Sequence, residues 1–172
     1  MPYDAKAIAN YLLDMAEAAG QALTPMKLQK LVYFAHGWHL GLTGEPLLDE
    51  QVQAWSFGPV VRSLYDAFRE FGADPIPRKA LIFEPLGGLK VRVKAPSLAE
   101  SVSVDKDLAE LFLTRIWEVY GGYSASQLSN MTHAPGTPWD RVSKHYGGNI
   151  PKHTTIPQEW IREYFQPQEK SA

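Results

Sequence analysis

The sequence predicts a mainly α protein with a small β-hairpin (α+β), a single compact helical domain around a central buried helix. Two patterns predict this fold. Apolar residues recur at helical spacing over most of the chain, whereas LKVRVK at 89–94 alternates strictly between apolar and basic residues. The 172 residues are enough for one core and contain no repeat or linker, so one domain is expected over 1–172. The tail, about 167–172, is expected to fray.

Two helices are predicted in the N-terminal quarter of the chain. The first spans 4–19, where apolar residues recur every three or four positions. The second begins at Thr24 and Pro25, a capping hydroxyl followed by proline. We expect it to run to about Leu40, with Gly41 and Gly44 breaking it. Its apolar residues cover most of its circumference, which predicts burial against several neighbours.

The middle of the chain mixes short elements. Residues 51–57 are predicted to be extended or irregular, and Gly58 and Pro59 are predicted to turn the chain into a third helix. ALIF at 80–83 is the expected partner of the strand at 89–94. The apolar residues of that strand should form a buried face. They are Leu89, Val91 and Val93.

Helical patterns return in the C-terminal half. A helix is expected at 105–120, followed by a short one at 125–132 that Ser124 caps. One helical turn is expected at 138–141, and a final helix begins near 155.

Charge and composition narrow the function. A net charge of −2 argues against strong, salt-dependent binding to nucleic acid. A local basic ridge is nevertheless present, and two interpretations stay open. It is either a solvated strand face that discourages aggregation, or a contact surface for an acidic protein or nucleic acid. The ridge comprises Arg78, Lys79, Lys90, Arg92 and Lys94.

The chain contains no cysteine, which excludes disulfides, thiolate catalysis and cysteine-based zinc sites. The N-terminus lacks the pattern of a signal peptide, and no apolar run approaches the ~18 residues of a membrane span. A cytoplasmic protein with no membrane partner is therefore expected.

The stretch KLQKLVYFAHGWHLG at 27–41 raises the question of a metal site. His36 and His39 are three residues apart and therefore share a helix face. No HExxH motif is present, and on a helical wheel His39 lies within the apolar stripe with His36 at its edge. Both are interpreted as structural, and a metal-dependent hydrolase is kept as an alternative. Its oxygen ligands would come from Glu45, Asp49 and Glu50.

Other catalytic patterns are weaker. Residues of the triad types occur without a GxSxG nucleophile elbow, at Ser126, Ser129, His133 and Asp140. The glycine pairs follow no phosphate-binding pattern. No catalytic residue, cofactor or metal is predicted.

Aromatic residues favour a binding protein. Five tryptophans and eight tyrosines are many for this length, and most should belong to the core. Trp55, Trp139 and Trp160 lie near the ends of predicted elements, where amphipathic rings often face a partner.

Several motifs together resemble one family. TPMKLQKLVYFAHGWHL is followed by GEPLLDEQVQAWSFGPVVRSLYDAFREFG, and later by IWEVYGG, SASQLSNMTHAPGTPW and IPQEWIREYF. This pattern is similar to the Panacea domain of SocA-like antitoxins, over nearly the whole chain. The residues that carry the family signature are Lys27, Gln29, Lys30, Tyr33, His36, Trp38, Trp55, Gly58 and Pro59.

The resemblance implies an antitoxin, not an enzyme. Such proteins occur in toxin–antitoxin systems and in phage-associated proteins, and they neutralise a toxin, usually encoded by the adjacent gene, by direct binding. The resemblance also implies a proteolytic adaptor role, in which the toxin is delivered to the ClpXP protease. Nucleic acid is not the expected partner, because the sequence shows no added DNA-binding region, although a nucleic-acid-binding regulator is kept as an alternative. Lys27 and Lys30 are expected on the open sector of their helix, and are therefore the favoured contact residues.

Overall fold

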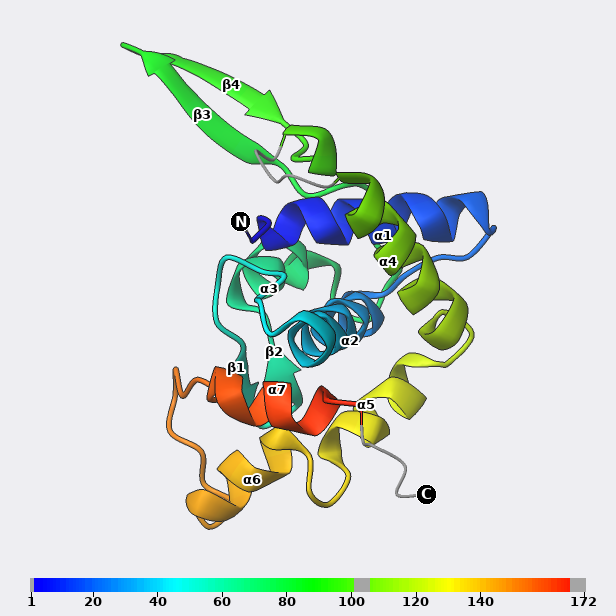
Figure 1. The fold of residues 1–172 in the computed structure, drawn as a ribbon. Helices are drawn as coiled ribbons and strands as arrows, with labels where there is room; N and C mark the ends of the chain where they lie inside the picture. Colours follow the sequence, from blue (N-terminus) through cyan, green and yellow to red (C-terminus); the bar gives the residue numbers. More distant parts are fainter. Residues whose placement is uncertain (1, 101–105, 168–172) are drawn as a thin grey trace.

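The computed structural model describes residues 2–100 and 106–167 and confirms the α+β fold, with helices around a central helix and two antiparallel β-hairpins (Figure 1). The predicted start of a helix at Asp105 and most of the tail expected to fray lie outside the described residues. The elements are α1 (Ala5–Ala18), α2 (Pro25–Thr43), β1 (Gln53–Trp55), β2 (Gly58–Val60), α3 (Arg62–Phe68), η1 (Arg69–Phe71), β3 (Ile82–Gly87), β4 (Lys90–Lys94), η2 (Leu98–Glu100), α4 (Lys106–Tyr120), α5 (Ala125–His133), α6 (Pro138–His145) and α7 (Gln158–Phe165).

Helix α2 runs through the middle of the domain and contacts α1, α3, α4, α5, α7 and β2 (Figure 1). Every residue from Leu28 to Gly37 is buried, which confirms the predicted central helix. The Thr24 hydroxyl caps it by accepting a hydrogen bond from the backbone N–H of Lys27 at 3.4 Å. The helix ends at Gly44, whose φ is 77°, so the predicted end near Leu40 is wrong.

Helix packing explains why α2 continues past Gly41. A Cβ on Gly37 would overlap the ring of Phe165, and a Cβ on Gly41 would overlap the backbone of Phe165. The two glycines lie one turn apart on the same face of α2. They let α7 approach closely, so Gly41 serves helix packing and not helix termination.

The segment after α2 forms a hairpin that the sequence did not predict. Strands β1 and β2 pair antiparallel, with Trp55 opposite Gly58 and Ala54 opposite Pro59. Pro59 therefore lies in a strand, and its predicted place at a helix start is wrong. Helix α3 begins only at Arg62. The chain can turn this tightly because Gly58 adopts a φ of 106°.

The predicted hairpin of β3 and β4 is present, but its predicted buried face is not. Val91 is 54% exposed and Val93 is 51% exposed, while Leu89 lies fully exposed in the connecting turn. The strands project from the body beyond α1 and α4 (Figure 1). Only the base is fixed: the buried Asn10 of α1 donates to the Pro96 carbonyl at 3.0 Å, and it exchanges hydrogen bonds with the backbone of Ala80 at 2.7 and 3.0 Å.

The C-terminal helices pack beneath α2 (Figure 1). Ser124 and Gln127 form a reciprocal capping box at the start of α5, as the Ser124 cap predicted. Helix α6 is longer than the single predicted turn, because Thr137 caps it and Pro138 occupies its first turn. None of the helices in the described part of the chain is long and apolar enough to cross a membrane.

Candidate partner-binding site

The signature residues lie on several sides of α2 and do not form one surface. Gln29 and Lys30 face the β1–β2 hairpin, which carries Trp55, Gly58 and Pro59. The other four face different neighbours, and these are Lys27, Tyr33, His36 and Trp38.

Gln29 and Lys30 hold the β1–β2 hairpin through its backbone. The Gln29 amide donates to the Val61 carbonyl and accepts from the Val61 N–H, both at 2.9 Å. The Lys30 ammonium donates to the carbonyls of Phe57 at 3.1 Å and Pro59 at 3.2 Å. Two adjacent side chains of α2 thus satisfy backbone groups of the hairpin turn, of β2 and of Val61, the residue directly after β2.

Lys30 is not on an open sector, so its prediction as an exposed contact residue is wrong. The residue is 2% exposed and has no carboxylate among its described partners. Burial lowers its pKa to about 8, because the charged ammonium is kept from water. Among the described residues, the partners of this charge are backbone carbonyls. Lys30 therefore fixes the hairpin turn to α2.

Two residues from the later motif SASQLSNMTHAPGTPW complete this region. The Trp139 indole N–H donates to the Trp55 carbonyl at 2.6 Å, and the rings of His133 and Trp139 stand edge to face at 4.3 Å. A Cβ on Gly58 would lie 2.8 Å from Lys30 Nζ and 2.9 Å from the His133 ring. We call this group the signature cluster: Gln29, Lys30, Trp55, Gly58, Pro59, His133 and Trp139.

The remaining signature residues also serve packing. The ring of Tyr33 is buried against Phe165, and burial raises its pKa. The indole of Trp38 donates to the Tyr120 hydroxyl at 2.6 Å. Lys27 is only half-buried. Its ammonium donates to the Gly121 carbonyl at 2.7 Å and so binds the chain just after the end of α4.

Both histidines bond backbone groups of the fold, and their predicted burial is reversed. His36 is 1% exposed and accepts a hydrogen bond from the Leu48 N–H at 3.3 Å, and burial lowers its pKa to about 4. His39 is only half-buried, and its ring bonds the Glu45 carbonyl at 2.7 Å and packs edge-on against Phe112. Within the described residues, no three histidine, aspartate or glutamate side chains are grouped as a metal site.

The residues considered for a triad do not form one. The His133 ring bonds the backbone carbonyl of Ser129 at 2.7 Å, and not a serine hydroxyl. The Asp140 carboxylate pairs with Lys144 at 2.7 Å and accepts from the Gly136 N–H at 2.9 Å, which together hold its pKa below its usual range.

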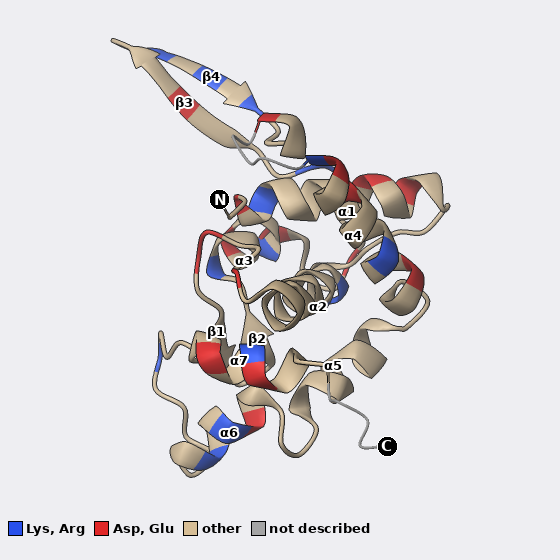
Figure 2. Cartoon of the chain, viewed as in Figure 1, with Lys and Arg blue, Asp and Glu red and all other residues tan. Residues whose placement is uncertain are grey.

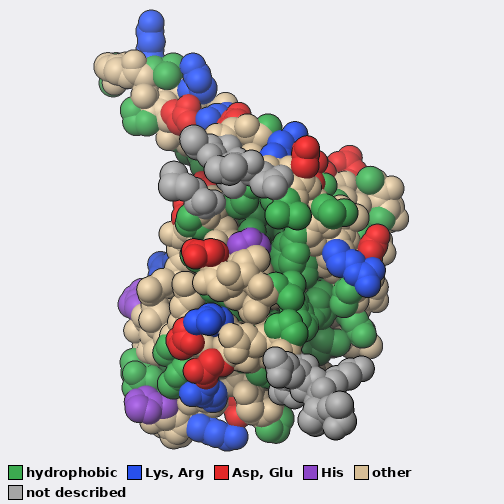
Figure 3. Space-filling model, viewed as in Figure 1, with side chains coloured by type: hydrophobic (Ala, Val, Ile, Leu, Met, Phe, Trp, Pro, Cys, Tyr) green, Lys and Arg blue, Asp and Glu red, His purple; other side chains and the backbone are tan. Residues whose placement is uncertain are grey.

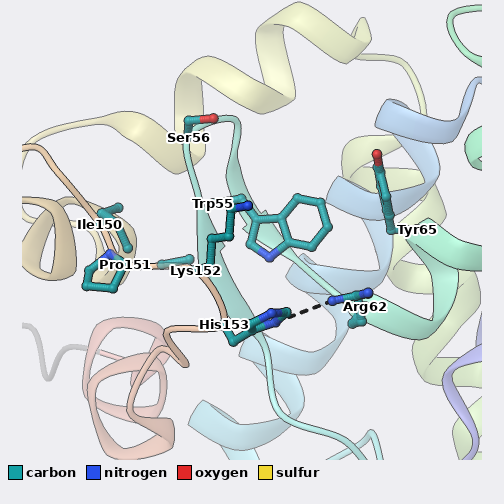
Figure 4. Close-up of a pocket in the computed structure, with 9 residues that line it drawn as sticks. Trp55, Ser56, Arg62, Tyr65, Ile150, Pro151, Lys152 and His153 are labelled. Carbon is teal, nitrogen blue, oxygen red and sulfur yellow. Dashed lines mark hydrogen bonds between the residues drawn. The ribbon is translucent and has the colours of Figure 1, made fainter.

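An exposed aromatic surface adjoins the signature cluster, and Trp55 belongs to both. On one side of Trp55 is a cavity of about 360 Å³ lined by Arg62, Tyr65 and His153 (Figure 4). A second cavity, of about 330 Å³, also has Trp55 in its wall, together with Phe57 and again Tyr65. Trp55 and Tyr65 line both cavities. Together with four side chains that line one of them, they make up what we call the Trp55 surface: Met26, Trp55, Phe57, Arg62, Tyr65 and Arg69.

The geometry of the Trp55 surface keeps its rings in place while leaving them accessible. The rings of Trp55 and Tyr65 meet edge to face at 4.6 Å, and the Trp55 indole N–H donates to Gln53 at 2.8 Å. Arg62 lies 5.9 Å over the Trp55 ring and reaches His153 at 3.4 Å (Figure 4). Phe57 is 61% exposed. Tryptophan, tyrosine, arginine and methionine are the residues that protein interfaces concentrate.

The other two predicted tryptophans differ from Trp55. Trp139 is bonded into the signature cluster, and Trp160 is covered by Arg141, whose guanidinium lies 4.1 Å from its ring. A second apolar area lies over α4, where Leu111 and Val119 are exposed (Figure 3).

Sequence reasoning missed Phe57, Tyr65 and the role of His133, because each becomes significant only through contacts across the chain.

Fold and site together define a helical domain whose exposed features suit binding of another protein. The family model described as "Antitoxin SocA-like, Panacea domain" matches residues 28–140, so the chain belongs to this family. The chain is also 37% identical over 169 residues to "Antitoxin SocA" of Caulobacter vibrioides (strain NA1000 / CB15N), covering 98% of this chain and 86% of that protein. No solved structure matches the chain. The resemblance inferred from the motifs is confirmed, and it supports an antitoxin role, a toxin partner in general and a regulatory rather than catalytic protein.

Proposed function

We propose that the protein neutralises one cognate toxin by direct protein–protein binding. The observation that carries this proposal is the similarity to Antitoxin SocA along nearly the whole chain. The proposed partner is a protein encoded by the adjacent gene. We further propose that the complex forms in the cytoplasm, and that the protein is phage-associated and presents the bound toxin to ClpXP as a proteolytic adaptor.

The Trp55 surface is the proposed toxin contact. Trp55 is the one signature residue among the nine whose ring lines two open cavities, and Arg62 and Arg69 place cationic groups beside it. Arg62 forms an ion pair with Asp66 at 3.1 Å. Arg69, by contrast, is exposed and has no ion-pair partner among the described residues. An apolar side chain of the toxin would fill a cavity, and a neighbouring carboxylate would face an arginine.

Co-expression tests the proposal. The product of the adjacent open reading frame should arrest growth when produced alone, and this chain should restore growth and co-purify with it. Trp55→Ala should weaken the complex by about 10-fold or more, as burial of a hot-spot ring commonly does. Trp160→Ala is the matched control, because that ring lies away from the Trp55 cavities. A harmless neighbour that does not bind would contradict the proposal.

Adaptor function needs a separate experiment. Purified toxin should be degraded by ClpXP faster when this protein is added, and Trp55→Ala should abolish the acceleration at concentrations that saturate the wild-type complex. Equal degradation with and without the protein would limit its role to neutralisation by binding.

A further inference from the structure

The β3–β4 hairpin presents an uncovered apolar face. Residues that stand opposite each other in an antiparallel pair share a face, so Phe83 and Val93 lie together, next to Pro85 and Val91. Phe83 is 69% exposed, and both valines are more than half exposed. Such a face costs free energy in water, and an isolated two-stranded hairpin is marginally stable at best.

The two edges of this hairpin differ in their capacity to bind another strand. Pro85 deprives β3 of one backbone N–H, and the pairing is irregular between Pro85 and Gly87. Strand β4, KVRVK, contains neither proline nor glycine and pairs without interruption from Lys90 to Lys94. Alternate residues of β4 direct their N–H and carbonyl groups away from β3, and these groups are available to a third strand.

The opposite face of the hairpin is basic. Lys90, Arg92 and Lys94 alternate along β4 and are balanced on the hairpin by Glu84 alone, in a protein whose net charge is −2 (Figure 2). Glu84 is already shared between Lys94 at 2.8 Å and Arg92 at 3.9 Å. Lys90 has no ion-pair partner among the described residues. The positive charges left to bind a partner are therefore those of Lys90 and Arg92, near the tip of the hairpin.

We propose that β4 binds an extended segment of the partner protein, which adds a third strand to the hairpin. This inference rests on the proposed function, because the partner is the toxin. The bound segment alternates apolar and acidic residues: its apolar side chains cover Val91 and Val93, and its carboxylates face Lys90 and Arg92. Asn10 holds the hairpin base on α1, so the edge is oriented before the partner arrives.

The test measures toxin affinity and amide exchange together. Val91→Thr/Val93→Thr removes the apolar face but retains strand propensity, and Lys90→Glu/Arg92→Glu repels an acidic strand. Each double variant should weaken binding of the adjacent-gene product by about 10-fold or more. In the wild-type complex, the outward-facing amides of β4 should exchange at least about 10-fold more slowly than in the free protein.

Two variants away from the hairpin serve as controls. Leu111→Gln removes an exposed apolar side chain on α4, and Arg115→Glu reverses an exposed charge on the same helix, away from both proposed contact surfaces. Circular dichroism must show all variants folded. If Trp55→Ala abolishes binding while both hairpin variants bind like wild type, strand addition is wrong and the antitoxin proposal stands. If wild-type protein does not bind the neighbour, both are wrong.

Two other occupants are distinguished in the same experiment. A concentration-dependent dimer of the free chain that Val91→Thr/Val93→Thr abolishes would assign the edge to a second copy. Salt-sensitive binding of a DNA duplex of about 20 base pairs that Lys90→Glu/Arg92→Glu abolishes would assign it to nucleic acid. Either result, with unchanged amide exchange of β4 in the toxin complex, would overturn the proposal.

Discussion

The two β-hairpins of this domain are stabilised in different ways. The β1–β2 hairpin has three-residue strands. Lys30 of α2 and Trp139 of α6 bond its backbone, and Gln29 of α2 bonds Val61, the residue directly after β2. The β3–β4 hairpin has longer strands, but Asn10 fixes only its base. Contacts with the rest of the domain, and not strand length, distinguish the two hairpins: the Ala54 N–H of β1 also donates to the Thr154 carbonyl at 2.8 Å.

The two hairpins also separate residues that fix the shape of the domain from residues that are free to bind. The signature cluster lies mostly inside the domain, where Lys30 and Pro59 are buried. Two surfaces that are free to meet a partner are the Trp55 surface, which adjoins this cluster, and the β3–β4 hairpin. Most signature residues therefore specify the framework, while Trp55 and the exposed residues that adjoin the cluster are the proposed contacts.

Breaking the framework at α2 should have the largest effect. Gly41→Ala places a methyl group against the Phe165 backbone, so α7 must move away from α2. The free energy of unfolding should fall by about 3 kcal/mol or more, as for an overpacked core. Gly122→Ala is the control, because nothing lies within 4 Å of its Cβ position. Urea denaturation of both variants measures the difference, and equal midpoints would contradict the close crossing.

The turn of the β1–β2 hairpin gives the next effect. Gly58→Ala combines a φ of 106° with crowding by Lys30 and His133, and should cost about 2–3 kcal/mol. Gly20→Ala has a φ of 69° but open space around the Cβ position, and should cost only about 1 kcal/mol. Thermal denaturation compares the pair. A Gly58→Ala protein as stable as Gly20→Ala would show that the cluster is not tightly packed.

Buried His36 predicts a pH dependence. Its folded-state pKa of about 4 lies below the ordinary value of 6.5, so the unfolded chain binds the proton first. Stability from this group is complete above about pH 6.5 and is lost as the pH falls towards 4, by about 2 kcal/mol at pH 5. His36→Gln should retain the bond from Leu48 and show a shallower loss between about pH 6.5 and 5. Parallel stability curves for the two proteins would refute this role.

The exposed hairpin should give the smallest stability change. Val91→Thr/Val93→Thr should alter the free energy of unfolding by less than about 0.5 kcal/mol, because both side chains are already in contact with water. Chemical denaturation of the free protein provides the measurement. A loss above about 2 kcal/mol would mean that the apolar face belongs to the folding core.

The sequence predicted features that depend on local pattern. The burial of α2 followed from its apolar circumference, the Thr24 cap from its neighbours, and the β3–β4 hairpin from strict alternation. The family followed from spaced motifs, and the family match confirms it.

Features that depend on contacts across the chain were not predicted. Lys30 was placed on an open sector because charge usually marks solvent, whereas its ammonium binds carbonyls that follow it by about thirty residues. Gly41 was interpreted as a helix end because only the approach of Phe165 reveals its packing role. The exposed face of β4 could not be known either, since alternation predicts two different faces but not which of them another element covers.

Hydrogen exchange of the free protein tests the difference between the hairpins most directly. The amide of Val61, the residue directly after β2, donates to the buried Gln29 side chain, so it should exchange only through large-scale unfolding. The amides of β4 should exchange through local opening, roughly 100-fold faster or more. If the β4 amides exchange as slowly as Val61, the β3–β4 hairpin is part of the rigid framework, and the proposed difference in anchoring between the two hairpins is wrong.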